Sequence, residues 1–248
     1  EMAEDLERIA MNFGGENIAA CIVEPIAGST GTLVPPKGYL KRIRDICNKH
    51  GILLIFDEVI TGWGRTGSAF AAQEWNVTPD IMTMAKATTN GVVPMGVVAV
   101  KEEIYDAVLD ASSAPEGTPE LFHGYTYSGI PVAVAAALAV QDIFDKEDLI
   151  NRAKEMSPYF QDGLHSLKDL KEVVSIRGYG MMGGIEINMK EKPGKAGYQV
   201  FKHCYDAGVN FKNTGDNLII APQFICEKKH IDEIIEKLRT GISNYSKS

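Results

Sequence analysis

The sequence lacks a long apolar run, and none of its apolar stretches approaches the ~20 residues that a membrane span requires. It also lacks a run of basic residues, and 33 acidic against 25 basic side chains give a net charge of -8. This balance argues against binding to a nucleic-acid backbone. The acidic first residues have neither the positive start nor the apolar segment of a signal peptide. We therefore expect a globular protein in aqueous solution, with neither a membrane nor a nucleic acid as partner.

Several motifs are absent as well. The 4 cysteines form no CxxC pair, so we expect reduced thiols in the cytoplasm. The 5 histidines show no HExxH or similar spacing, and we expect no metal site. The apolar residues before Asp57 and Glu58 match a Walker B strand, but a nucleotide hydrolase also needs a GxxxxGK[ST] loop, which the sequence does not contain.

The first part of the chain carries the pattern of an α/β fold. Apolar runs at 18–23 and 52–56 predict buried strands, and the apolar positions between Tyr39 and His50 have helical spacing. A strand, a helix and a strand in this order form a βαβ unit with parallel strands. Further strands are expected at 81–84 and 96–100. We therefore predict a mostly parallel sheet with flanking helices.

The pattern changes after an alanine-rich helix expected at 131–144. The charged run 145–148 is a candidate boundary, and shorter strands alternate with helices beyond it. The expected elements there are helices at 149–167, 198–207 and 231–242 and strands at 173–176, 184–187 and 218–220. We predict two domains, a larger one at 1–145 and a smaller α+β one at 146–248.

Polar side chains follow three of the expected strands, namely Glu24, Asp57 and Lys86. In an open α/β sheet, ligands bind at the carboxyl ends of the strands. Lys86 lies among small and apolar residues, where desolvation lowers the pKa of an amine and frees it as a nucleophile. Asp57 follows an apolar strand and needs a cationic partner. A protonated pyridine nitrogen and a lysine Schiff base meet both needs. Taken singly, the three residues also fit a helix cap, a loop carboxylate and a solvated lysine.

Four segments in order resemble the motifs of class III aminotransferases, which are pyridoxal-phosphate enzymes of fold type I. The segments are 22–28 (IVEPIAG), 56–67 (FDEVITGWGRTG), 79–86 (PDIMTMAK) and 123–129 (HGYTYSG). The residues at 89–96, 123–128 and 176–180 resemble the ω-amino acid (β-alanine):pyruvate transaminases most closely. The resemblance covers nearly the whole chain.

The resemblance implies a role for each matching residue. Lys86 resembles the Schiff-base lysine, Asp57 the partner of the pyridinium nitrogen, and Val59 the side chain against one ring face. Thr126 resembles the hydroxyl that binds the cofactor phosphate of a neighbouring subunit, which implies a homodimer with shared sites. Glu24 matches a strand-end glutamate that supports the cofactor site.

One residue distinguishes subgroups of the family, and two features depart from the family's pattern. Ile60 replaces a glutamine of ornithine-type relatives, which favours the ω-amino acid subgroup. Lys212 takes the place of the arginine that grips the substrate carboxylate, although a solvated lysine is an equal alternative there. The glycine-rich phosphate loop and the stacked aromatic residue of the family's N-terminal part have no match. We therefore expect a C-terminal portion of a longer enzyme, with an incomplete large domain.

The implied activity is transfer of an amino group from an ω-amino acid or amine to pyruvate, with pyridoxal phosphate as cofactor. We expect the chain to be poorly active or inactive by itself. Two alternatives stay open: an aminomutase of the glutamate-1-semialdehyde type, and a non-catalytic remnant that only binds weakly or assembles.

Overall fold

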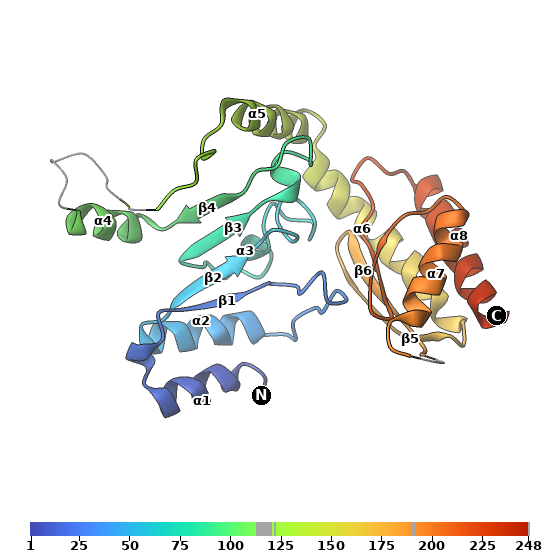
Figure 1. The fold of residues 1–248 in the computed structure, drawn as a ribbon, viewed down its shortest axis with the longest axis horizontal. Coiled ribbons are helices and arrows are strands. Elements are labelled where there is room, and N and C mark those ends of the chain that lie inside the picture. The colour runs from blue at the N-terminus through green and yellow to red at the C-terminus, as the bar shows by residue number, and fades with distance from the viewer. Residues whose placement is uncertain (113–120, 122, 190–191, 248) are drawn as a thin grey trace.

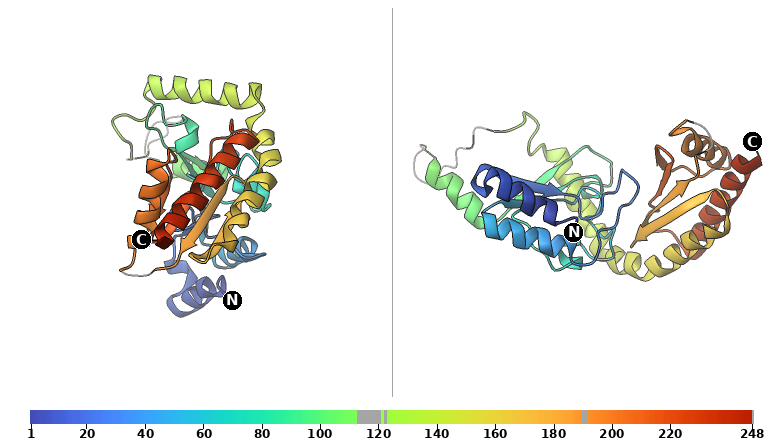
Figure 2. Two further views of the ribbon diagram at one scale, coloured as in Figure 1. Left: turned by 90° about the vertical axis from the view of Figure 1, so that its right-hand side faces the viewer. Right: turned by 90° about the horizontal axis from the view of Figure 1, so that it is seen from below.

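The computed structural model describes residues 1–112, 121, 123–189 and 192–247. In this part of the chain the strands form two four-stranded sheets, one in each of two units that lie side by side (Figure 1). Two further views show the same arrangement, with the C-terminal helix on the side of the second unit that faces away from the first unit (Figure 2). No helix of the described residues is long and apolar enough to cross a membrane.

The first sheet has the strand order β1 (Ala20–Val23), β2 (Leu53–Asp57), β3 (Ile81–Met84) and β4 (Val97–Val100). The first three strands are parallel and β4 runs antiparallel to β3. Helix α2 (Tyr39–His50) connects β1 to β2 and buries one apolar face, as its spacing predicted. Gly51 ends this helix in a left-handed conformation, with φ at 69°. The predicted βαβ unit and mostly parallel sheet are confirmed.

The remaining helices of the first unit leave much apolar surface exposed. Helix α1 (Glu4–Phe13) packs on α2, where Glu4 and Arg42 form an ion pair of 2.6 Å. The short α3 (Ala71–Glu74) follows β2, while α4 (Glu102–Ala111) and α5 (Pro131–Lys146) follow β4. Ile22 and Val98 on the sheet are 61% and 65% exposed. Strand residues of this kind usually have a covering layer.

The second sheet is antiparallel, in the order β5 (Val173–Tyr179), β6 (Met182–Ile187), β8 (Asn217–Ile220) and β7 (Lys212–Thr214). Helices α6 (Leu149–His165), α7 (Lys195–Asp206) and α8 (Lys228–Lys247) cover its outer face (Figure 1). One apolar cluster joins these helices to the strands. The expected strand at 173–176 was too short, and β7 and α4 were not predicted.

The hairpin of β5 and β6 touches the first unit near its turn. Arg177 donates a hydrogen bond of 3.0 Å from Nε to the carbonyl oxygen of Gly31. The Tyr179 hydroxyl bonds to Glu74, and its ring lies 5.0 Å from the ring of Trp75. Burial and the Glu74 carboxylate raise the pKa of Tyr179 to about 12. The hairpin therefore holds the two units together through polar and aromatic contacts.

Substitution of Gly180 at the hairpin turn tests how closely the two units pack. Gly180 and Gly215 share a φ of +56°, but a Cβ at Gly180 would overlap the backbone of Arg65 and Thr66, whereas Gly215 has open space around it. Gly215→Ala should lower the free energy of unfolding by about 1 kcal/mol through backbone strain alone. Gly180→Ala should lower it by about 2 kcal/mol more, because the backbones must separate. Urea titration measures both, and equal losses would contradict the tight contact.

Candidate active site

The charged residues predicted at the strand ends meet at one edge of the first sheet. Glu24 follows β1, Asp57 ends β2, and Lys86 begins the short 3-10 helix η2 (Lys86–Thr88) after β3. Because these strands are parallel, their carboxyl ends lie at the same edge. Asp57, Glu24 and Lys212 all lie near enough to Lys86 to change its pKa. The structure thus brings these four charges together, and their catalytic roles stay predictions.

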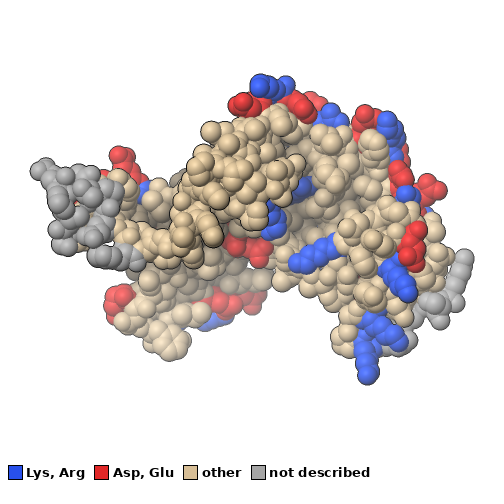
Figure 3. Space-filling view, turned by 45° about the horizontal axis from the view of Figure 1, so that its top comes forward, with Lys and Arg blue, Asp and Glu red and all other residues tan. Residues whose placement is uncertain are grey.

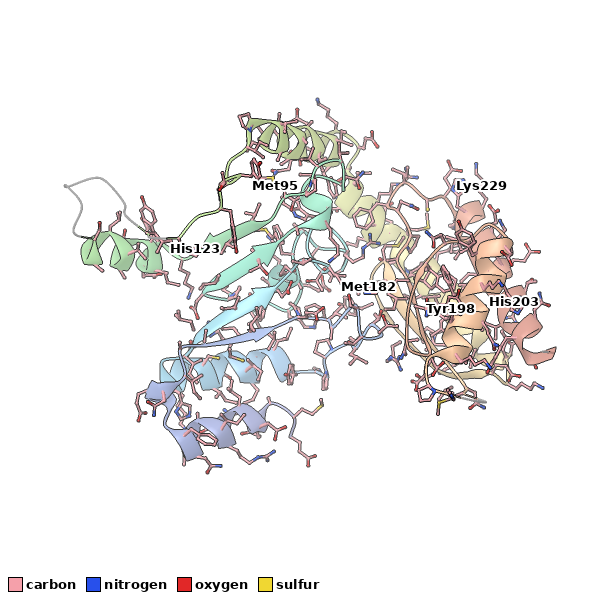
Figure 4. The ribbon with its side chains drawn as sticks, in the orientation of Figure 1. Met95, His123, Met182, Tyr198, His203 and Lys229 are labelled. Atoms are coloured by element: carbon pink, nitrogen blue, oxygen red, sulfur yellow. The ribbon has the colours of Figure 1, made fainter. Side chains whose placement is uncertain are left out.

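A cavity of about 490 Å³ lies beside Lys86, between the two units. Its size is that of a small-molecule site. Basic and acidic side chains gather in the hollow between the units (Figure 3), and Met182 lies on the side of the second sheet that faces the first unit (Figure 4). The cavity is lined from the first unit by Gly28, Ser29, Val59, Ile60, Gly62, Arg65, Lys86, Ala87, Asn90 and Gly91, and from the second by Met182, Lys212, Ile219, Ala221 and Phe224.

The backbone holds Lys86 in an uncommon conformation. Its φ of 44° lies in the left-handed region, which costs a residue with a Cβ on the order of 1–3 kcal/mol. Thr88 secures this turn, since its hydroxyl donates to the carbonyl of Ala85 at 3.0 Å and accepts from Nε1 of Trp63 at 3.0 Å. The strained turn is therefore held by Thr88 together with Trp63 of the 56–67 segment.

Burial is the largest influence on Lys86 and lowers the pKa of its ammonium group. The carboxylates of Asp57 and Glu24 oppose this shift, while Lys212 adds to it by charge repulsion. The Lys86 residue as a whole is nevertheless exposed within this chain, so the expectation of a desolvated lysine is met only in part. Its surroundings favour the uncharged amine more than water does.

The two neighbouring acids after β2 have different surroundings. Asp57 accepts a 3.0 Å hydrogen bond from the amide of Val59 through Oδ1, and its other oxygen has no hydrogen-bond partner among the described residues. Glu58 is fully buried, which raises its pKa, and it accepts bonds from Thr61 and from the amides at the start of α3. Glu58 therefore holds the loop, and Asp57 keeps an oxygen available for a ligand.

The other predicted residues divide between the cavity wall and the surface. Val59 and Ile60 line the cavity, and a Cβ on Gly28 would lie 2.7 Å from Cδ1 of Ile60, so a larger residue there would displace the Ile60 side chain. Glu24 accepts a 3.0 Å bond from the Gly28 amide and so fixes the same loop. Thr126 lies in an exposed turn before α5 and does not line the cavity of its own chain.

The sequence analysis missed several residues of the cavity wall. Arg65, Met182, Ile219 and Phe224 were not predicted as site residues. Arg65 lies within a motif segment, which is a signal that could have found it. Met182 and Ile219 belong to the second sheet and Phe224 to the turn after β8, and no local pattern encodes the position of this unit relative to Lys86.

Comparison with known proteins identifies the family. The family model described as aminotransferase class-III matches residues 1–242, and the chain belongs to this family. An omega-aminotransferase of Caulobacter vibrioides is 51% identical over 96% of this chain and 54% of its own length. An omega-amino acid–pyruvate aminotransferase of Pseudomonas putida is 44% identical over 95% of this chain and 52% of its own length. The chain thus spans about half the length of the curated relatives it matches.

Solved structures show the same fold. A transaminase solved with L-alanine superimposes with a TM-score of 0.94 at 31% identity, over 99% of this chain and 59% of that one. A thermostable omega transaminase of Pseudomonas jessenii gives a TM-score of 0.94 at 30% identity, over 99% of this chain and 55% of its own. The predicted fold, that of fold type I transaminases with part of the large domain, is confirmed.

The charges around Lys86 generate a prediction about its pKa. Lys212→Met removes a neighbouring cation and should raise the pKa of Lys86, whereas Asp57→Asn removes an anion and should lower it. The pH dependence of acetic-anhydride labelling at Lys86, followed by mass spectrometry, measures both shifts. Lys202→Met on exposed α7 is the control and should change neither. A downward shift in Lys212→Met would show that the two amines do not face one another.

Proposed function

We propose that this chain carries the catalytic lysine of a pyridoxal-phosphate transaminase that moves an amino group from an ω-amino acid or amine to pyruvate. The observation that supports this proposal most is that Lys86 and Val59 line one cavity, with Asp57 near enough to change the pKa of Lys86, in a chain of the class-III family. The names of the relatives support amino donor and pyruvate as the substrate classes.

The residues present fit the cofactor's ring. The amine of Lys86 and the apolar side chain of Val59 line one cavity of about 490 Å³. The carboxylate of Asp57, which has one oxygen without a partner among the described residues, lies near enough to Lys86 to change its pKa. These are the groups that bind the aldehyde carbon, the protonated ring nitrogen and the ring face. The cofactor phosphate would bind Thr126 of a second subunit, because the Thr126 of the same chain is outside the cavity.

Pyridoxal phosphate, when bound, supplies an aldehyde that exchanges amines and a ring that accepts electrons. Lys86 would hold the cofactor at its aldehyde carbon and would release it to the incoming donor amine. Burial lowers the pKa of Lys86, which favours the uncharged Nζ that would take the proton from the amine-bearing carbon. Asp57 would hold the proton of the ring nitrogen, and Lys212 would attract a donor carboxylate as a point charge.

A homodimer with shared sites is part of this proposal. The turn with Thr126 and the helix after it expose apolar side chains, among them Tyr125 at 77%, Tyr127 at 79% and Leu138 at 61%. Exposed apolar surface of this extent is typical of an interface. A second copy that covers it would bring its Thr126 close to the first copy's cavity.

Two further expectations belong to the proposal. We divide the chain into a cofactor-binding unit at 1–145 and a small unit at 146–248, and we place the protein in the reducing cytoplasm, where its 4 free cysteines stay reduced. The chain alone should be a poor catalyst, because Lys86 is exposed within it and one face of the first sheet is uncovered. Water at the lysine weakens every electrostatic effect in the cavity.

The test of the proposal is covalent attachment of pyridoxal phosphate at Lys86. The protein is mixed with the cofactor and reduced with borohydride, and the modified peptide is located by mass spectrometry. The cofactor should be found on Lys86, and Lys86→Ala should abolish both the visible absorption band and any amine-dependent pyruvate consumption. Lys202→Ala should keep both.

Modification spread over several surface lysines, with no preference for Lys86, would contradict the proposal. Product analysis with and without pyruvate separates the reaction types. A transaminase needs the acceptor for turnover, whereas an aminomutase isomerises the donor without it.

A further inference from the structure

Arg65 lies in the cavity wall, and none of the described carboxylates pairs with it. It belongs to the loop between β2 and α3 and lines the cavity beside Lys86. Burial lowers the pKa of Arg65 to about 10, and no carboxylate of the described residues pairs with its guanidinium group. A buried cation without a carboxylate needs other strong partners.

Its partners are two carbonyl groups of the second unit. Nη1 of Arg65 donates to the carbonyl of Met181 at 2.7 Å and to that of Pro222 at 2.7 Å. The guanidinium carbon lies 4.5 Å from the centre of the Phe224 ring, and the Arg65 carbonyl accepts from the Met181 amide at 2.9 Å. Both hydrogens of Nη1 are therefore used within the protein, which leaves none on this atom for a substrate anion.

The two carbonyls lie at adjacent strand ends. Met181 comes directly before β6 and Pro222 follows the end of β8 by two residues. In β8, Ile219 pairs with Lys212 of β7. Arg65 thus binds the second sheet at the ends of β6 and β8. Strand β7 begins at the same end of the sheet with Lys212, which lines the cavity.

We propose that Arg65 is a positioning residue that sets the place of Lys212 relative to Lys86. It thereby determines how tightly the site holds an amino donor that carries a carboxylate. An arginine suits this task because one nitrogen donates to both carbonyls while the plane rests on an aromatic ring, a geometry that a lysine ammonium does not reproduce. The inference rests on the proposed function, since it names the feature of the donor that Lys212 would recognise.

The experiment compares Arg65→Met and Arg65→Lys with the wild type, in full chains under the conditions that give the wild type its activity. KM and kcat are measured for β-alanine and for 1-phenylethylamine, which has no carboxylate. Arg65→Met should raise the KM for β-alanine about tenfold, which is about 1.4 kcal/mol. It should leave the constants for the amine within about twofold, and Arg65→Lys should recover part of the loss.

A double mutant tests whether the effect passes through Lys212. In a Lys212→Met background, Arg65→Met should add no further rise in the KM for β-alanine, because the group it positions is gone. The control Arg239→Met removes an arginine that pairs with Asp169 in the same unit and should change neither donor's constants. A parallel loss for both donors in Arg65→Met, or full additivity in the double mutant, would overturn the proposal.

Hydrogen exchange gives a readout that does not need activity. In Arg65→Met, the amides of β7 and β8 should exchange at least about tenfold faster, while those of α2 keep their rates. Unchanged exchange in β7 and β8 would overturn the inference. A wild type that turns over neither donor would count against the proposed function, and the exchange rates would still decide whether Arg65 holds these strands.

Discussion

The common direction of β1, β2 and β3 is the constraint on which the candidate site depends. Because these strands are parallel, Glu24, Asp57 and Lys86 come to one edge, although they are far apart in the sequence. The opposite charges lie near enough to change the pKa of Lys86, and burial opposes them. The protonation of Lys86 is thus set by two opposing effects: desolvation favours the uncharged amine, and the neighbouring carboxylates favour the ammonium form.

The second unit faces this edge and contributes a third of the residues that line the cavity. The hairpin of β5 and β6 reaches the first unit through Arg177 and Tyr179, and Arg65 reaches back to the ends of β6 and β8. These contacts are hydrogen bonds and aromatic packing between the two units, and they lie close to the cavity beside Lys86. The distance between Lys86 and Lys212 is therefore set by the joint between the units, and a change in that joint changes the ligand that fits.

Sequence reasoning was strongest where local patterns determine structure. The bounds of α2 match the prediction because helical spacing, the cap at Gly51 and the flanking apolar runs all agree. Strand β7 (Lys212–Thr214) was not predicted because it is only three residues long and all three are polar. It is held as a strand by pairing with β8. The positive φ of Lys86 has no local signature in the sequence. The motif that contains Arg65 marks the residue, but the hydrogen bond of its guanidinium group to the carbonyl of Pro222 follows only from contacts made on folding. The four meeting charges could be predicted only through the strand-end rule and the family resemblance.

The central claim is that Lys86 and Asp57 face the two ends of one bound ring. The most direct measurement is a crystal structure of the protein grown with pyridoxal phosphate. The account predicts continuous density from Nζ of Lys86 to the cofactor and a carboxylate oxygen of Asp57 about 2.7–2.9 Å from the ring nitrogen. Cofactor density in the cavity that leaves Asp57 bonded only to the Val59 amide, or that joins another lysine, would contradict it.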